Sequence, residues 1–116
     1  MSYNLAKIGE MAYTSLQTYN EIIGDQVDAL WADASAEIRA FYPMIADFYL
    51  RNPEADQKYS HELYLILKKL NGWSYGDTYD DTNKKSPMII PYQDLNAARK
   101  VKYKIVKNVI VGNIEG

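Results

Sequence analysis

Cysteine is absent from this chain of 116 residues, and histidine occurs only once, as His61. The absence of cysteine excludes disulfides and thiolate metal sites, and nothing marks an oxidising compartment. Neither standard Gly-rich phosphate loop is present, and no histidines or carboxylates have the spacing of metal ligands. The sequence therefore predicts a protein that is not an enzyme, with no catalytic residue, no bound metal and no cofactor.

Long apolar runs are also missing, and the chain does not start with the basic and then apolar pattern of a signal peptide. We therefore predict a cytoplasmic protein with no membrane partner. A chain of this length forms one domain, and the sequence contains no internal repeat, low-complexity run or inter-domain linker.

Positive and negative charge are unevenly distributed, although the formal net charge is only -2. Residues 1–56 carry three basic and nine acidic side chains, whereas residues 57–116 carry ten basic and six acidic ones. The C-terminal half is thus the favoured side for an anionic partner. Four lysines near the end are more simply explained as the solvated face of a helix than as a nucleic-acid stripe: Lys100, Lys102, Lys104 and Lys107. No nucleic acid is expected as a partner.

Four segments repeat their apolar residues every three or four positions, which is typical of helices with one buried face. The helices are expected over residues 5–23, from about 33 to 51, from 54 or 57 to 70, and from 96 to 111. Asp33 is the candidate N-cap of the second helix. Pro43 interrupts that helix, and it predicts a kink or a break at Tyr42.

A long loop over residues 71–92 separates the last two helices. It combines several turn-forming residues with four large aromatic residues: Trp73, Tyr75, Tyr79 and Tyr92. Loops of this length in small domains are mostly functional or disordered, and the aromatic content argues against disorder. Residues 88–90 could pair with residues 73–75 as two short strands. The expected fold is mainly α, with about four helices around a long ordered loop and at most a short β-hairpin.

The aromatic residues of this loop admit two interpretations. Trp73 and Tyr75 could plug the end of a helical bundle, or they could stack on a planar base. Nearby His61, Lys84 and Lys85 favour the second interpretation, because cations and amides beside aromatic faces take up phosphate charge.

The acidic residues of the loop and the single histidine have simpler uses. Asp77, Asp80 and Asp81 lack the alternation of a calcium loop, so their spacing favours capping and turn hydrogen bonds. A lone histidine on a helix, such as His61, usually makes a structural hydrogen bond or lines a pocket.

The loop and its surroundings resemble a known family. The run Gly72-Trp73-Ser74-Tyr75-Gly76, then Asp80, Lys84, Pro87, Pro91-Tyr92 and Leu95, resembles the signature of the RyR domain, the repeat named after the ryanodine receptor calcium channels. Upstream, Ser60-His61-Glu62-Leu63-Tyr64 resembles the His-x-x-Trp helix motif of that family. The longer single-repeat form in bacterial and phage proteins is similar at Ala12-Tyr13, Ile23-Gly24-Asp25, Trp31 and Asn52-Pro53. Two positions depart from the family, with Tyr64 in place of a frequent Trp and Ser86 in place of a frequent His.

The resemblance spans a single domain over residues 1–116, with N-terminal helices in 1–51 and the core repeat in 52–112. It implies a mostly helical, non-enzymatic module that recognises a small, nucleotide-type anion. Tyr64 would be the stacking ring, and the pocket would be formed or supported by His61, Trp73, Tyr75, Asp80, Lys84 and Tyr92. Since the chain has one repeat, a homodimer is the natural way to complete a two-repeat clamp. The alternative function is protein–protein interaction through a tyrosine-rich surface.

Overall fold

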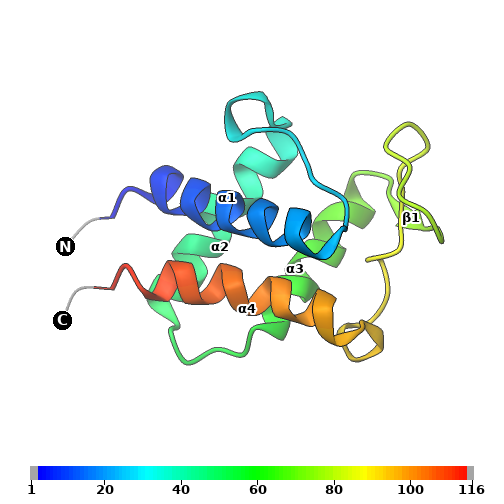
Figure 1. The fold of residues 1–116 in the computed structure, drawn as a ribbon. Helices are drawn as coiled ribbons and strands as arrows, with labels where there is room; N and C mark the ends of the chain where they lie inside the picture. Colours follow the sequence, from blue (N-terminus) through cyan, green and yellow to red (C-terminus); the bar gives the residue numbers. More distant parts are fainter. Residues whose placement is uncertain (1–2, 115–116) are drawn as a thin grey trace.

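The computed structural model describes residues 3–114 and confirms the mainly helical fold (Figure 1). The helices of this part of the chain are α1 (Leu5–Ile23), α2 (Ala36–Arg51), α3 (Lys58–Leu70) and α4 (Ala97–Val111). Two short 3-10 turns, η1 (Trp31–Asp33) and η2 (Tyr92–Asp94), and two strands, β1 (Ser74–Tyr75) and β2 (Lys85–Ser86), complete the described elements. The first two and last two residues of the expected domain lie outside the description. Within residues 3–114, no helix combines the length and apolar character needed to cross a membrane.

The core lies between α1, α2 and α4. Helices α1 and α4 run side by side in opposite directions, and α2 packs behind them (Figure 1). Their apolar positions recur at helical spacing and form one buried cluster: Ile8, Ala12, Phe41, Ile45, Ala46, Tyr49, Val106 and Ile110. Helix α3 adds partly buried side chains at one end of this cluster, among them Tyr64. This arrangement leaves α3 and the loop that follows it beside the segment between α1 and α2.

The second helix begins two residues later than the sequence predicts. Asp33 lies in η1, and the N-cap is Ser35, whose side chain accepts a hydrogen bond from the backbone N–H of Ile38 at 3.2 Å. The predicted cap at Asp33 was therefore wrong, because the 3-10 turn takes up Asp33. At α4 the cap is Asn96 as expected, and it accepts from the backbone N–H of Arg99 at 2.8 Å.

Helix α2 continues through Pro43, so the predicted break at Tyr42 does not occur. Helix α1 approaches α2 closely at this point, and Gly9 permits the approach. A Cβ atom on Gly9 would lie 2.8 Å from the backbone nitrogen of Pro43 and 2.9 Å from the carbonyl carbon of Tyr42. Packing against α1 stabilises a helix that the proline alone would weaken.

Replacing Gly9 with alanine is expected to lower the free energy of unfolding by about 2 kcal/mol, because backbone atoms of α2 would have to move. Alanine is the better helix former, so propensity alone predicts the opposite sign. Urea denaturation measures the change. The control is Thr14→Ala on the exposed side of α1, which should stay close to the wild type. A Gly9→Ala protein as stable as the wild type would contradict the close approach of the two helices.

The strands form a parallel pair instead of the hairpin that the sequence suggests. Ser74 pairs with Lys85 and Tyr75 with Ser86, while the segment 88–90 stays outside the sheet. The reason is an extra turn between the strands. The chain has already reversed when it reaches Asp80, which forms an antiparallel bridge with Lys85, and the turn after Asp80 reverses it again, so β2 runs in the same direction as β1. The predicted strand over residues 88–90 was wrong. The segment is apolar because it packs against the interior of the protein, where Ile89 is buried.

Candidate functional site

Two adjoining cavities lie between the α1–α2 connection, α2, α3 and the long loop, and the smaller one also borders α1 and α4. The smaller has a volume of about 120 Å³, and the larger about 560 Å³. Both are lined by the same six residues at their boundary: Gln26, Asp28, Phe41, Tyr42, Tyr64 and Tyr79. The two cavities therefore form one hollow divided by side chains. Its size falls in the range of small-molecule sites, roughly 300–1,000 Å³.

Aromatic rings form the dividing wall of this hollow. Tyr42 comes from α2, Tyr64 from α3 and Tyr79 from the long loop. The Tyr64 ring stacks on His61, with centroids 5.7 Å apart and planes at 21°. Burial raises the pKa of Tyr64 to about 12, and it also raises the pKa values of Tyr42 and Tyr79. The three hydroxyl groups thus stay protonated at neutral pH and can donate hydrogen bonds.

Trp73 forms part of the wall of the larger cavity. Its side chain is almost fully buried, and Tyr79 lies against it with ring centroids 5.7 Å apart. The Nζ atom of Lys68 lies 4.2 Å from the centroid of the Trp73 ring and 3.0 Å from a carboxylate oxygen of Glu37. The cation–π contact and the ion pair hold the Lys68 side chain in place. The positive charge of Lys68 is therefore largely compensated by Glu37 and the Trp73 ring.

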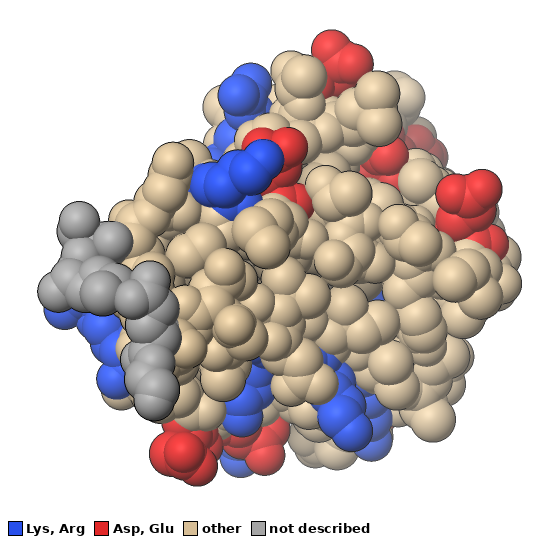
Figure 2. Space-filling model, turned by 60° about the vertical axis from the view of Figure 1, so that its left-hand side comes forward, with Lys and Arg blue, Asp and Glu red and all other residues tan. Residues whose placement is uncertain are grey.

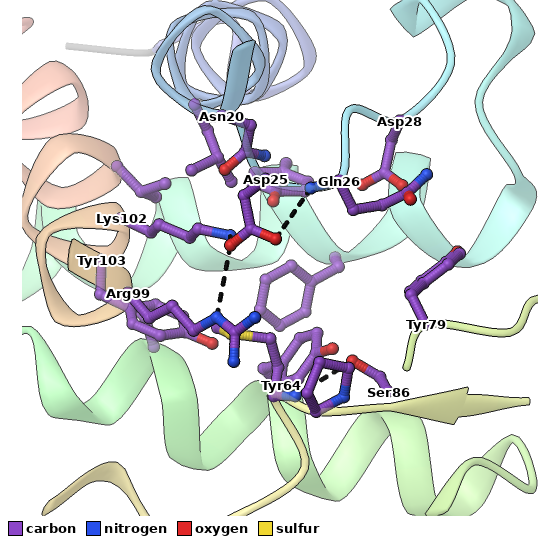
Figure 3. Close-up of a pocket in the computed structure, with 17 residues that line it drawn as sticks. Asn20, Asp25, Gln26, Asp28, Tyr64, Tyr79, Ser86, Arg99, Lys102 and Tyr103 are labelled. Atoms are coloured by element: carbon purple, nitrogen blue, oxygen red, sulfur yellow. Dashed lines mark hydrogen bonds and ion pairs between the residues drawn. The ribbon is translucent and has the colours of Figure 1, made fainter. Parts of the chain in front are cut away.

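An ion group closes one side of the smaller cavity (Figure 3). The carboxylate of Asp25 accepts hydrogen bonds from Lys102 at 2.9 Å, from Arg99 at 3.3 Å and from the backbone N–H of Gln26 at 2.8 Å. Burial by itself raises the pKa of Asp25, but the hydrogen bonds from Lys102, Gln26 and Arg99 and the charge of Lys102 outweigh it and bring the value to about 2. Asp25 is therefore ionised and joins the α1–α2 connection to α4.

The charges that line the two cavities balance. Four side chains are basic and four are acidic: Lys68, Lys84, Arg99 and Lys102, and Asp25, Asp28, Glu37 and Asp81. Lys84 has no acidic partner among the described residues, and its Nζ atom donates to the carbonyl oxygen of Asn71 at 2.8 Å. On the outer face shown in Figure 2, the basic side chains lie in separate groups. No three carboxylates or imidazoles within residues 3–114 lie close enough to hold a metal ion.

Three of the seven site residues expected from the sequence line the larger cavity. These are Tyr64, Trp73 and Lys84. His61 lies behind Tyr64 and is fully buried, with one ring nitrogen 2.6 Å from the Tyr103 hydroxyl and the other 2.6 Å from the Ile90 carbonyl oxygen. His61 thus supports the site from outside the cavity.

The other three expected residues, Tyr75, Asp80 and Tyr92, line neither cavity. Tyr75 is half exposed and donates a hydrogen bond to Asp77. Asp80 accepts two hydrogen bonds from Asn83 and so shapes the turn before β2. The hydroxyl oxygen of Tyr92 accepts from Gln57 at 2.9 Å. These residues maintain the loop that carries Trp73, Tyr79 and Lys84.

The cavity also contains residues that sequence reasoning missed. Asp25, Asp28, Phe41 and Tyr42 all come from the N-terminal half. Asp25 ends the Ile23-Gly24-Asp25 run that resembles the longer form of the family, but the other three belong to no motif, and none of the four was expected to line a pocket. The available signal was a pair of acidic residues in the connection after α1, together with aromatic residues on α2. Neither pattern indicates which side chains face a cavity.

The fold and the site define a small helical module with an aromatic cavity between its N-terminal helices and its long loop. The family model of the RyR domain matches residues 53–112, just over half of the chain, and the protein therefore belongs to the RyR domain family. The matched segment includes α3, the long loop and α4, whereas α1 and α2 precede it. No solved structure matches the chain significantly.

Proposed function

We propose that this RyR domain protein binds a small nucleotide-type anion in the paired cavity. The observation that carries the proposal is the wall of Tyr42, Tyr64 and Tyr79, which faces both cavities. Aromatic faces of this kind stack on a planar base, and each such stack contributes about 1–3 kcal/mol.

Lys84 is the side chain best placed to meet the phosphate. It lines the larger cavity without an acidic partner among the described residues, and its backbone has φ 55°. A lysine in the left-handed region is strained by about 1 kcal/mol, and such strain is concentrated at functional sites. Glycine or asparagine would relieve it. A cation at a position whose backbone favours glycine or asparagine supports a role in anion binding.

Replacing Lys84 with asparagine is expected to weaken nucleotide binding about tenfold, because one charge-assisted hydrogen bond to phosphate is lost. The stability should stay the same or rise, since asparagine tolerates a positive φ. Calorimetry with a panel of mononucleotides and cyclic dinucleotides measures the affinity.

The matched control is Lys104→Asn, an exposed lysine of α4 that lines neither cavity. This variant should bind like the wild type. Failure of every nucleotide to bind the wild-type protein would reject the proposed function, and equal loss in both variants would remove the specific role of Lys84.

The lining of the paired cavity comes from distant segments of one chain, with α2 and the α1–α2 connection on one side and α3 and the loop on the other. We therefore propose that one copy is sufficient for binding. A homodimer, a cytoplasmic location and the lack of enzymatic activity stay predictions.

A further inference from the structure

Asp28 lies at the boundary of the two cavities and lines both. Its backbone N–H donates to the Gln17 side chain at 2.8 Å, and the next carbonyl, that of Ala29, accepts from the Tyr13 hydroxyl. Two side chains of α1 thus fix the segment. Within the described part of the chain, no hydrogen bond or ion pair holds the Asp28 carboxylate. Figure 3 places this carboxylate on the opposite side of the hollow from Arg99, on the same side as Tyr79.

The cations near Asp28 are already paired with other acids. Lys102 is bound to Asp25, and Lys68 is bound to Glu37. Burial raises the pKa of Asp28, the longer-range charges of Lys68 and Lys102 oppose this, and the charge of Asp81 adds to the rise. The Asp28 carboxylate oxygens are not among the fully buried atoms that lack a hydrogen-bond partner in the described residues, so water still reaches them. Asp28 is therefore a partly desolvated acceptor beside aromatic rings, and a ligand with N–H donors would replace the water at its carboxylate.

We propose that Asp28 selects bases with two neighbouring N–H donors, of which guanine is the common example; this rests on the nucleotide-binding function proposed above. The two oxygens of a carboxylate accept two parallel N–H bonds. The N1–H and 2-amino groups of guanine lie side by side in the plane of the ring. When guanine stacks on Tyr64, the edge that carries its N1–H and 2-amino groups lies at the side of the stack. A carboxylate beside the stack can then accept a hydrogen bond from each of these two groups.

Other bases offer a poorer match to Asp28. Adenine has an acceptor nitrogen next to its amino group, so one carboxylate oxygen would face a lone pair. Hypoxanthine keeps the N1–H donor but lacks the 2-amino group. Each comparison removes or reverses one hydrogen bond while the ring that stacks stays nearly the same.

The selecting residue lies outside the segment that matches the RyR domain model, since Asp28 precedes residue 53. Tyr42, which lines the same cavities, also precedes it. The N-terminal helices thus supply one wall of the site, and the matched segment supplies Tyr64, Tyr79 and Lys84. Base selectivity in this protein would then reside in its N-terminal addition to the core repeat.

Calorimetry of wild type and Asp28→Asn with GMP, IMP and AMP tests the assignment. The wild type is expected to bind GMP about tenfold more tightly than IMP, and AMP no better than IMP. In Asp28→Asn the amide NH₂ replaces one acceptor and would face a guanine N–H, so the preference for GMP should disappear.

The matched control is Asp81→Asn, which changes another acid of the larger cavity and should keep the preference for GMP. Thermal melting of Asp28→Asn without ligand should show an equal or higher midpoint, because a partly desolvated charge is removed; lost binding could then not be attributed to unfolding. Equal affinity of the wild type for GMP and AMP would overturn the assignment, as would a preference that persists in Asp28→Asn. Either result leaves nucleotide binding intact. Failure of all three nucleotides to bind also overturns the assignment, and failure of the wider panel overturns the proposed function as well.

Discussion

Replacing His61 with alanine is expected to lower the free energy of unfolding by about 4 kcal/mol, measured by urea denaturation at pH 7.5. The imidazole is fully buried between the Tyr103 hydroxyl and the Ile90 carbonyl oxygen, each 2.6 Å from a ring nitrogen. The Ile90 carbonyl can only accept, so Nε2 carries the hydrogen and Nδ1 accepts from Tyr103. Alanine would leave both partners unsatisfied and create a cavity beneath Tyr64.

The stability should also fall as the pH drops through the range in which histidine titrates. Burial lowers the pKa of His61 below its ordinary value of 6.5, although the Ile90 hydrogen bond and the charge of Glu62 oppose this. The unfolded chain therefore takes up a proton before the folded chain does. Stability is fully present above about pH 6.5 and is lost below it.

The control for both effects is His61→Gln, which keeps one donor and one acceptor but does not titrate. It should lose less stability than the alanine variant, and the fall in stability between pH 7 and 5 should become shallower. An alanine variant as stable as the wild type would show that the two short hydrogen bonds contribute little. An unchanged pH dependence in the glutamine variant would assign the titration to another group.

Replacing Tyr64 with leucine is expected to weaken nucleotide binding about thirtyfold, because a stacking face worth roughly 2 kcal/mol is removed. One face of Tyr64 rests on His61, and the ring lines both cavities. Leucine keeps an apolar side chain in contact with the core cluster, so the fold should survive. Calorimetry with the nucleotide that binds most tightly in the panel measures the loss.

The matched control is Tyr75→Leu, since Tyr75 lies in the loop motif of the same family but lines neither cavity and is 50% exposed. It should bind nucleotide like the wild type. The two variants also separate the two candidate functions. A protein partner recruited by exposed tyrosines would be lost from Tyr75→Leu and kept by Tyr64→Leu, which is the reverse of the result expected for a cavity ligand.

The positions of the helices could be predicted from the sequence because their signals are local. The apolar spacing from Leu5 to Ile23 and the cap at Asn96 both depend on residues within one or two turns of the chain. The family could also be recognised, because the main part of its signature, from Ser60 to Leu95, is one continuous segment within the matched residues 53–112. The prediction of Asp33 as a cap failed for the same local reason, since Ser35 offers an equally good cap two residues later.

The roles of the site residues depend on contacts between distant segments, which no local pattern encodes. Tyr64 lines a cavity while His61, one turn away on the same helix, is buried between Ile90 and Tyr103. Asp28 carries no motif, and it becomes part of the site because α1 holds its segment opposite the loop. The periodicity of apolar residues indicates that a side chain faces the inside of the protein. Whether that side chain packs against another one or lines a cavity depends on how the N-terminal helices pack against the loop.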